Sequence, residues 1–423
     1  MRLCPCVLGF AALFLIGACA QQQAVEPATG AWVGTITTEG NVTTVVNESG
    51  SVWGGRASLV EELSIGVESG PDEYMFGEIA GIYATDDEIY VIDGQKPAVR
   101  VYDFEGRHLR DLGGAGEGPG EYRRPTYVTG TEDGTIHVMS RRNQRLNLYG
   151  PEPGAVDSWP LSRWIQCCIR PFVVAPGGAV WVEIGVLNEE RLDFDPGMQM
   201  HGPDGPIGDP LMVPEFEYER WTYRRNGREI EAVQYAPGIV WAIAPPGLLV
   251  AGASDRYRFE IHSPEGTVTV VEKQADPVEL IDPELEYARL SMERHQEVDF
   301  VWNGRIPSHK PVYWFFLPTH SGEIWVFREG KAEPIPDCDP TEPGASPAGG
   351  MAPRPKRCFT APQRVDVFEI EGRYLGEIDL SGLPTHIVHS YIRGDTVVTT
   401  SQDDMGTIMV KRYRLVLPGE QEQ

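Results

Sequence analysis

One segment of this sequence recurs 47 residues later, and this repeat constrains the fold more than any other feature. Residues 89–106 align without gaps with residues 136–153, and a short polar turn precedes each copy. Apolar and polar residues alternate in both copies, so that Val91 and Val138 occupy equivalent positions. Alternation with period two predicts β-strands with one buried face, and each copy is therefore expected to be an antiparallel hairpin.

The same strand and turn pattern recurs more loosely along the rest of the chain. These looser copies are residues 177–182, 259–266, 321–326 and 365–372, followed by a last hairpin from 395–399 and 408–413. Together the repeats indicate six units. Small sheets that cannot bury both faces alone satisfy one another by packing around an axis, which predicts an all-β fold, a six-bladed β-propeller of four-stranded blades. A two-sheet β-sandwich or a pair of separate β domains is the alternative.

The segment from Leu59 to Gly66 resembles the outermost strand of a blade, although it precedes the first complete unit. We expect it to pair with the hairpin that ends the chain, so that the N-terminal strand closes the last blade. Such closure leaves no free sheet edge and couples the two ends of the ring.

The glycine-rich run from Gly113 to Tyr122, followed by Pro125, resembles the turn between blades of NHL-repeat and related six-bladed propellers. Residues 66–76 are a degenerate copy, with Phe76 in the aromatic position. The resemblance covers residues 57–417, and the chain is similar to bacterial 6-bladed β-propeller lipoproteins. It implies that glycines supply positive φ in the turn and that the aromatic residue fills the gap between blades. The expected inter-blade turn residues are Gly116, Gly118, Pro119, Gly120 and Tyr122.

The sequence departs from the repeat at several places. Ser140 stands where the first copy has Asp93, which we expect to hold the loop after its strand. Residues 183–235 and 327–362 are expected to be insertions. The segment 282–300 predicts a short polar helix on one rim, near 282–298, with Asp282 as its N-cap and Pro283 as its first helical residue.

The N-terminal sequence predicts that the protein is located in the cell envelope. An apolar run too short to span a membrane ends in Gly17-Ala18-Cys19, which resembles the bacterial lipobox, so Cys19 is the expected lipidation site. Ala20, rather than Asp, favours the outer membrane by similarity with enterobacterial lipoproteins. An ordinary cleaved signal is the alternative. The expected divisions are a lipoprotein signal peptide at 1–18, a tether at 19–30, a β-hairpin at 31–56, the propeller at 57–417 and a tail at 418–423.

The net charge argues against a nucleic-acid partner, and the cysteines favour a compartment in which disulfides form. The chain has 62 acidic and 36 Lys and Arg residues, for a net charge of −26, and so carries no electrostatic footprint for nucleic acid. Outside the signal, Cys338 and Cys358 flank a segment rich in Pro, Gly and Ala, and we expect them to form a disulfide. The state of the adjacent Cys167 and Cys168 stays open between free thiols and pairing with the loop.

No catalytic motif is present, and the candidate ligands have ordinary explanations. His386, His389 and the run Glu293-Arg294-His295 are interpreted as rim or strand-end residues. Turn carboxylates could contribute to a calcium site but are normally only solvated. These carboxylates are Asp86, Asp87, Asp403 and Asp404. The tryptophans could line a binding face, but core packing is favoured for them: Trp164, Trp181, Trp221, Trp241, Trp302, Trp314 and Trp325.

The expected function is that of a lipid-anchored binding or scaffold propeller, which holds a protein, peptide or glycan on one rim through inserted loops. The cell envelope is its expected location, and neither a nucleic-acid partner nor a metal or other cofactor is predicted. Some propellers that this chain resembles are calcium-dependent hydrolases or lactonases, whose metal ligands come singly from different blades. A hydrolase with calcium in the central channel is therefore the alternative, and fold alone does not decide between them.

Overall fold

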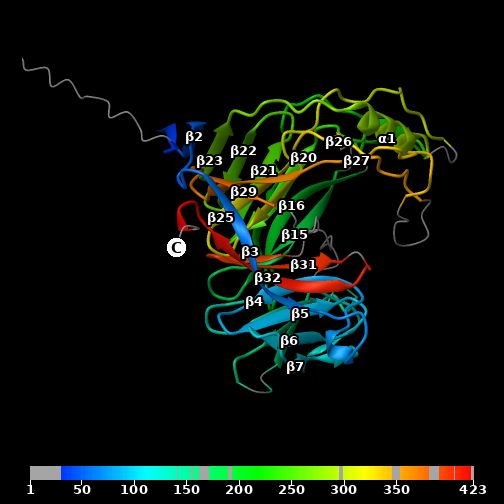
Figure 1. Cartoon of the computed structure of the whole chain (residues 1–423). Helices are drawn as coiled ribbons and strands as arrows, with labels where there is room; N and C mark the ends of the chain where they lie inside the picture. The colour runs from blue at the N-terminus through cyan, green and yellow to red at the C-terminus, as the bar shows by residue number, and fades with distance from the viewer. Residues whose placement is uncertain are drawn as a thin grey trace, which may run out of the picture.

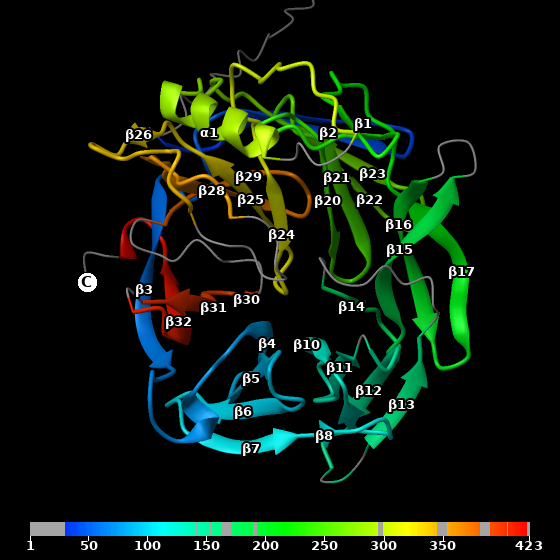
Figure 2. The ribbon, with the colours of Figure 1, turned by 90° about the vertical axis from the view of Figure 1, so that its right-hand side faces the viewer.

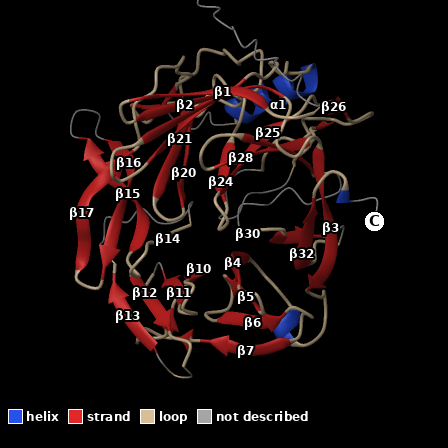
Figure 3. Cartoon of the chain, turned by 90° about the vertical axis from the view of Figure 1, so that its left-hand side faces the viewer, coloured by secondary structure: helices blue, strands red, loops and turns tan. Residues whose placement is uncertain are grey.

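The computed structural model describes residues 30–140, 142–152, 154, 156–161, 171–188, 193–294, 299–344, 353–380, 390–403 and 405–420. Six four-stranded antiparallel blades surround a common axis, and the protein is a six-bladed β-propeller (Figures 1 and 2). The first strand of each blade lies innermost and the fourth lies at the periphery (Figure 3). The predicted fold class is confirmed.

The first three blades follow one another directly along the chain. Blade 1 has β4 (Ile79–Ala84), β5 (Glu88–Asp93), β6 (Val99–Asp103) and β7 (His108–Leu112). Blade 2 has β10 (Pro125–Gly130), β11 (Ile136–Ser140), β12 (Arg145–Tyr149) and β13 (Val156–Pro160). Blade 3 has β14 (Val173–Val174), β15 (Val180–Asn188), β16 (Asp193–Gly202) and β17 (Gly205–Met212).

The remaining three blades include the N-terminal strand. Blade 4 has β20 (Ile239–Ala244), β21 (Leu248–Ala253), β22 (Arg258–His262) and β23 (Val268–Lys273). Blade 5 has β24 (Phe315–Pro318), β25 (Glu323–Glu329), β28 (Gln363–Glu369) and β29 (Tyr374–Asp379). Blade 6 has β30 (Tyr391–Arg393), β31 (Thr396–Gln402), β32 (Ile408–Val416) and β3 (Arg56–Ile65).

The repeated segments are the second and third strands of blades 1 and 2. Residues 89–106 contain the β5–β6 hairpin, and residues 136–153 contain the β11–β12 hairpin. Val91 and Val138 are both fully buried in one apolar cluster that joins the two blades. The expected hairpins are present, but the expectation of one buried face is wrong, because neighbouring blades cover both faces and consecutive residues of β5, β6 and β11 are buried.

Ring closure occurs as expected. Strand β3 pairs antiparallel with β32, with Leu59 opposite Leu415 and Ile65 opposite Val410. The start of β3 also pairs in parallel with the end of β29, from Arg56 to Ser58, so the outer edges of blades 5 and 6 are continuous.

The N-terminal hairpin is part of the ring rather than a peripheral unit. It consists of β1 (Val33–Glu39) and β2 (Val42–Ser49), and β2 pairs in parallel with β23 as an extra strand of blade 4. Its buried Asn47 joins three parts of the chain. The Asn47 side chain accepts hydrogen bonds from Trp32 Nε1 (2.7 Å) and Tyr374 N (2.8 Å), and it donates to the carbonyls of Glu272 and Gly372 (3.1 Å each).

One predicted insertion is shorter than expected. Residues 183–188, 193–202 and 205–212 belong to blade 3 strands, so the insertion at 183–235 is wrong for its first part and begins only after β17. The sequence misled because β17, at the periphery, exposes most of its side chains and therefore lacks apolar alternation. The second insertion begins at Gly330, after β25 ends.

The predicted helix is α1 (Asp282–Glu293), and residues 295–298 lie outside the described part. Asp282 is not the N-cap, because the helix already includes it and Ile281 precedes it in extended conformation. The Glu284 carboxylate accepts the Ile281 N–H at 3.1 Å, which satisfies the backbone donor of the N-cap residue.

Candidate functional site

Three insertions leave the propeller at the same end. Residues 213–238 join β17 to β20, residues 274–314 join β23 to β24, and residues 330–362 join β25 to β28. In an antiparallel four-stranded blade, connections between blades and those between the second and third strands share one end. Their described residues form a layer over this end, which we call the cap; α1 lies in it (Figures 1 and 2).

The cap also contains four short strands. These are β18 (Tyr223–Arg225), β19 (Arg228–Ile230), β26 (Glu333–Pro334) and β27 (Phe359–Thr360).

The three insertions share an apolar core of their own. Tyr235, Ala288 and Phe359 come from the first, second and third insertion, and all three are buried in one cluster. The rings of Tyr287 and Phe359 meet edge to face at 5.7 Å. A second cluster places Met292 of α1 against the first insertion. The cap is therefore one packed layer and not three independent loops.

A buried ion pair within the second insertion extends to the end of β25 in blade 5. Lys310 Nζ lies 2.7 Å from the Glu284 carboxylate, and both side chains are essentially inaccessible to water. The same ammonium group lies 3.4 Å from Glu329 and donates to the Gly330 carbonyl at 2.9 Å, where the third insertion begins. Several partners compensate the cost of burying these charges.

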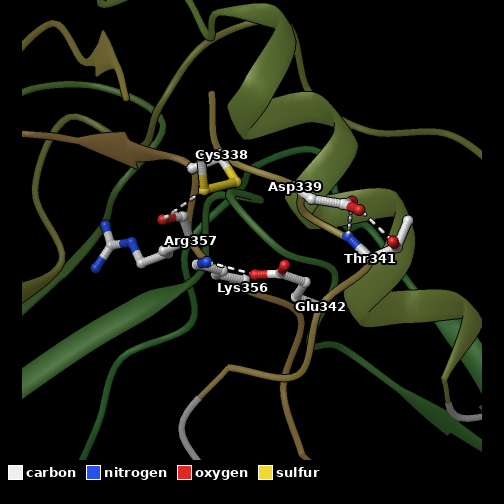
Figure 4. The surroundings of a disulfide bond; sticks show 7 residues. Cys338, Asp339, Thr341, Glu342, Lys356 and Arg357 are labelled. Carbon is white, nitrogen blue, oxygen red and sulfur yellow. Dashed lines mark hydrogen bonds and ion pairs between the residues drawn. A yellow bond between two sulfur atoms is a disulfide. The ribbon is translucent and has the colours of Figure 1, made fainter. Parts of the chain in front are cut away.

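The disulfide between Cys338 and Cys358 closes the third insertion at its base, as predicted (Figure 4). The Ile335 N–H donates to the Cys358 carbonyl at 3.0 Å, and Lys356 pairs with Glu342 at 2.5 Å beyond the disulfide. Residues 345–352 lie outside the described part. Cys167 and Cys168 lie in the segment 162–170, which also lies outside it.

The cap exposes large apolar side chains. Val301 is 64% exposed, Ile335 41% and Trp314 39%. Trp314 stacks on Phe315 at 5.8 Å, so its indole is held in place while one part meets water. Core packing is correct for Trp181, Trp241 and Trp325, which are buried, but it is wrong for Trp314. Trp164 lies outside the described residues.

The predicted inter-blade turn residues have structural roles. Tyr122 is fully buried, and its hydroxyl contacts that of Tyr149, which in turn donates to the Gly120 carbonyl at 3.0 Å. Gly120 has φ +75°, whereas Gly118 N–H donates to the Glu121 carboxylate at 2.8 Å.

The other turn residues lie around this centre. Gly116 adopts φ +158°, and an added Cβ there would lie 2.0 Å from the Glu121 carboxylate. Pro119 is exposed at the apex. In the degenerate copy, Tyr102 contacts the Glu73 carbonyl and its ring lies 6.2 Å from that of Phe76, so the aromatic packing recurs in blade 1.

Asp93 holds the loop after its strand, as expected, and it also holds the segment that precedes β4. Its buried carboxylate accepts the Gln95 N–H (3.0 Å) after its strand and the N–H groups of Gly77 and Glu78 (3.2 Å each) before β4. In blade 2, Asn143 accepts the corresponding Arg123 N–H at 2.8 Å, which explains why Ser140 can stand in the Asp93 position.

A buried charge lies between blades 4 and 5, where its partners come from both. The Asp366 carboxylate is 3.0 Å from Arg328 and 3.6 Å from Lys273, and it accepts hydrogen bonds from the hydroxyls of Tyr257 (2.6 Å) and Tyr374 (3.0 Å). Burial raises the pKa of Asp366, but the two cations and the hydroxyls outweigh burial and lower it. These groups are enclosed and mutually satisfied, so the network is structural.

A second constellation, the axial cluster, lies at the end of the ring opposite the cap. It consists of Tyr83, Asp86, His320, Tyr391 and Arg393, which come from blades 1, 5 and 6. The His320 ring lies 4.6 Å from Tyr391 and 5.9 Å from Tyr83, and the two tyrosine rings meet at 5.1 Å. Arg393 lies 3.5 Å from Asp86 on the exposed rim. Sequence reasoning missed this cluster, because its members are single residues in distant turns.

The rings of the axial cluster are neutral at neutral pH. Burial among the surrounding strands and the charge of Arg393 lower the pKa of His320 to about 4. The residue as a whole is nevertheless partly exposed to solvent at this end of the ring. Burial raises the pKa of Tyr391 to about 12 and raises that of Tyr83. The cluster can thus offer uncharged hydrogen-bonding groups beside an ion pair.

The candidate metal ligands do not converge within the described ranges. Asp86 pairs with Arg393, and Asp403 accepts the N–H groups of Met405 and Thr407 in its own turn. No group of three His, Cys, Asp or Glu side chains there has an arrangement suited to a metal. His295, His386, His389 and Asp404 lie outside these ranges. Glu293, at the end of α1, pairs with Arg289 at 2.5 Å.

Residues 69–153, which cover blade 1 and most of blade 2, match the profile of a protein family described as a 6-bladed beta-propeller. No curated protein matches the sequence. Among the helices of the described residues, none has the length and apolar character needed to cross a bilayer.

Several solved structures are similar over most of the chain. A member of the DUF4221 family from Bacteroides vulgatus is 11% identical, with a TM-score of 0.47, and the match covers 86% of this chain and 99% of that one. Virginiamycin B lyase from Staphylococcus aureus is 8% identical, with a TM-score of 0.35 and coverage of 84% and 98%. Likeness at this level carries no argument about function. The described topology itself is that of a six-bladed β-propeller.

Proposed function

We propose that this protein is a lipid-anchored, extracytoplasmic binding or scaffold protein that holds a protein, peptide or glycan partner on the cap. The observation that carries the proposal is the cap itself: three insertions share one core, and their outer surface exposes Val301, Trp314 and Ile335. Loops held by a rigid scaffold are common binding sites, and the exposed apolar side chains of the cap would add contact area for a partner.

The construction of the cap supports a recognition role. The buried pair of Lys310 and Glu284 fixes its helix, and the disulfide closes the third insertion. A surface that is already ordered loses little conformational entropy when a partner binds.

The proposed anchor agrees with the placement of the cap. Strand β1, which follows the tether, and helix α1 lie toward opposite ends of the propeller (Figures 1 and 3). A chain of the length of the predicted tether, residues 19–30, would span about 20 Å as a random coil. Acylation at Cys19 would therefore keep the β1 side near the membrane and direct the cap away from it. We place the protein in the cell envelope, on the outer membrane.

Site-specific photocrosslinking tests partner binding. A photoreactive amino acid is placed at Trp314 or Val301 on the cap, and at Ile36 on β1, which is an exposed apolar control at 54% exposure. Discrete adducts are expected from the cap positions in living cells. Adducts from Ile36 alone, or no adduct from either cap position, would contradict the proposal.

The anchor has a separate test. Cys19→Ser removes the thiol that accepts the lipid, so we expect soluble or uncleaved protein in cell fractions. A variant that still sediments with membranes after a high-salt wash would show that Cys19 is not the anchor.

A further inference from the structure

The cap carries an unusual concentration of positive charge for this chain. Residues 220–228 include Arg220, Arg224, Arg225 and Arg228 and no acidic residue, whereas the whole protein has a net charge of −26. Arg220, Arg224 and Arg228 are exposed. We call the four side chains on and beside the β18–β19 hairpin the arginine tip.

These guanidinium groups lack the carboxylate partners that several other exposed arginines have. Arg107, Arg123 and Arg373 each pair with a carboxylate, at Asp103, Glu117 and Glu369. Within the described part of the chain, no carboxylate lies within ion-pairing distance of any arginine of the tip; Arg220 only approaches the Tyr218 ring, at 6.0 Å. The tip therefore has charge available for an external group.

The acidic residues beside the tip are largely engaged. Glu229 accepts a hydrogen bond from the Thr222 hydroxyl at 2.6 Å, and Glu231 accepts one from the Tyr218 hydroxyl. Glu219 pairs at 2.8 Å with Arg305, which stacks on the Trp221 ring at 4.4 Å. Glu215 and Glu217 are exposed and precede the tip in the same insertion.

The hairpin that carries the tip is held firmly. Tyr223 is buried against Phe300 with ring centroids 5.2 Å apart, and it shares an apolar cluster with Met292 of α1. Arg224 and Val301 exchange two backbone hydrogen bonds of 2.8 Å. These bonds occupy one edge of the hairpin, so a peptide cannot add to that edge as a strand.

We propose that the arginine tip binds an anionic polysaccharide through its sulfate or carboxylate groups; this deepens the proposed function and rests on it. The planar guanidinium fork matches such oxyanions in bidentate geometry. A globular acidic protein would meet the negative body of the propeller, whereas a thin chain can contact the tip alone. Screening limits repulsion beyond about 8 Å at physiological ionic strength, which favours the local contact.

Binding of defined probes to the purified full-length protein tests the proposal. Heparin fragments supply sulfate groups, polygalacturonate supplies carboxylates, dextran is the neutral control, and polyglutamate represents an acidic polypeptide. The test variant carries Arg220→Gln, Arg224→Gln and Arg228→Gln. The control variant carries Arg107→Gln, Arg123→Gln and Arg373→Gln, which remove the same charge from paired positions. Thermal melts verify that both variants fold.

We expect heparin or polygalacturonate to bind the wild type, more weakly as salt rises, and dextran not to bind. The test variant is expected to lose about tenfold or more in affinity, while the control variant loses about twofold. Lysine at the three tip positions should restore part of the binding. Equal loss in both variants, no binding of either polyanion by the wild type, or tip-dependent binding of polyglutamate alone would overturn the proposal. Crosslinking from Trp314 reports the proposed function independently of these results.

Discussion

At the scale of single residues, close packing in the turn between blades 1 and 2 leaves no room for a side chain at Gly113. Its φ is +73°, and an added Cβ would lie 2.3 Å from the Tyr122 ring and 2.4 Å from the Gly120 carbonyl. We expect Gly113→Ala to lower the free energy of unfolding by about 2–4 kcal/mol, from backbone strain and overpacking. Urea denaturation measures the change.

Gly227 is a matched control for this substitution, because it has the same φ of +73° but no atom within 4 Å of an added Cβ. Gly227→Ala should cost about 1 kcal/mol, which is the backbone effect alone. Equal losses for the two variants would show that the turn does not pack as described.

The axial cluster predicts a pH dependence through His320. Because the pKa of His320 is lowered to about 4 in the folded protein, and that of an unfolded histidine is about 6.5, the unfolded state takes up the proton first as pH falls. Stability from this group is therefore complete above pH ~6.5 and is lost progressively between ~6.5 and ~4. His137 and His201, whose pKa values are also lowered by burial, act in the same direction.

Thermal melts at pH 7.5 and 5 check this prediction. His320→Gln should lose less stability than the wild type between these conditions, because it removes one of the three groups. NMR titration of the His320 ring should give a midpoint well below the ordinary value. A midpoint at or above 6.5, together with an unchanged pH dependence in the variant, would contradict it.

At the scale of elements, the N-terminal hairpin joins blades 4 and 5. The buried Asn47 side chain makes one hydrogen bond to Trp32 of the same N-terminal segment and three to backbone groups of blades 4 and 5. Asn47→Ala should destabilise the protein by about 2–4 kcal/mol, since it leaves buried polar groups unpaired. Asn41→Ala, at the exposed turn of the same hairpin, removes one bond to Gly266 and should cost less than about 1 kcal/mol. Equal costs from chemical denaturation would place the hairpin outside the cooperative unit.

Sequence analysis could predict those strands and hairpins whose own residues show a repeated or alternating apolar pattern. The β5–β6 and β11–β12 hairpins were predictable because similar apolar residues recur 47 positions apart, although both faces of these strands are buried. Strand β3 carries a blade-like pattern of its own, although Lys411, which pairs with its Glu61, is 350 residues away. Strand β17 was not predicted, because most of its side chains are exposed and its sequence has no apolar alternation. The expected N-cap, Asp282, is instead the first residue of α1, because Ile281 precedes the helix and the Glu284 carboxylate accepts the Ile281 N–H.

At the scale of the whole molecule, the candidate sites depend on the closed ring. The cap takes its core from three insertions, and the axial cluster takes single residues from blades 1, 5 and 6, so neither has a local motif. Sequence patterns therefore predicted the fold and the disulfide but not the cap surface or the cluster. The axial cluster also takes Tyr391 and Arg393 from blade 6, which β3 completes.

Amide hydrogen exchange on the intact protein tests ring closure most directly. The backbone pairs that join β3 to β32 extend from Ser58 opposite Val416 to Ile65 opposite Val410. If this ladder closes the ring, the bonded amides of β3 should exchange as slowly as those of β32 and open together with them. Fast exchange throughout β3, while β32 and β31 stay protected, would contradict closure by the N-terminal strand.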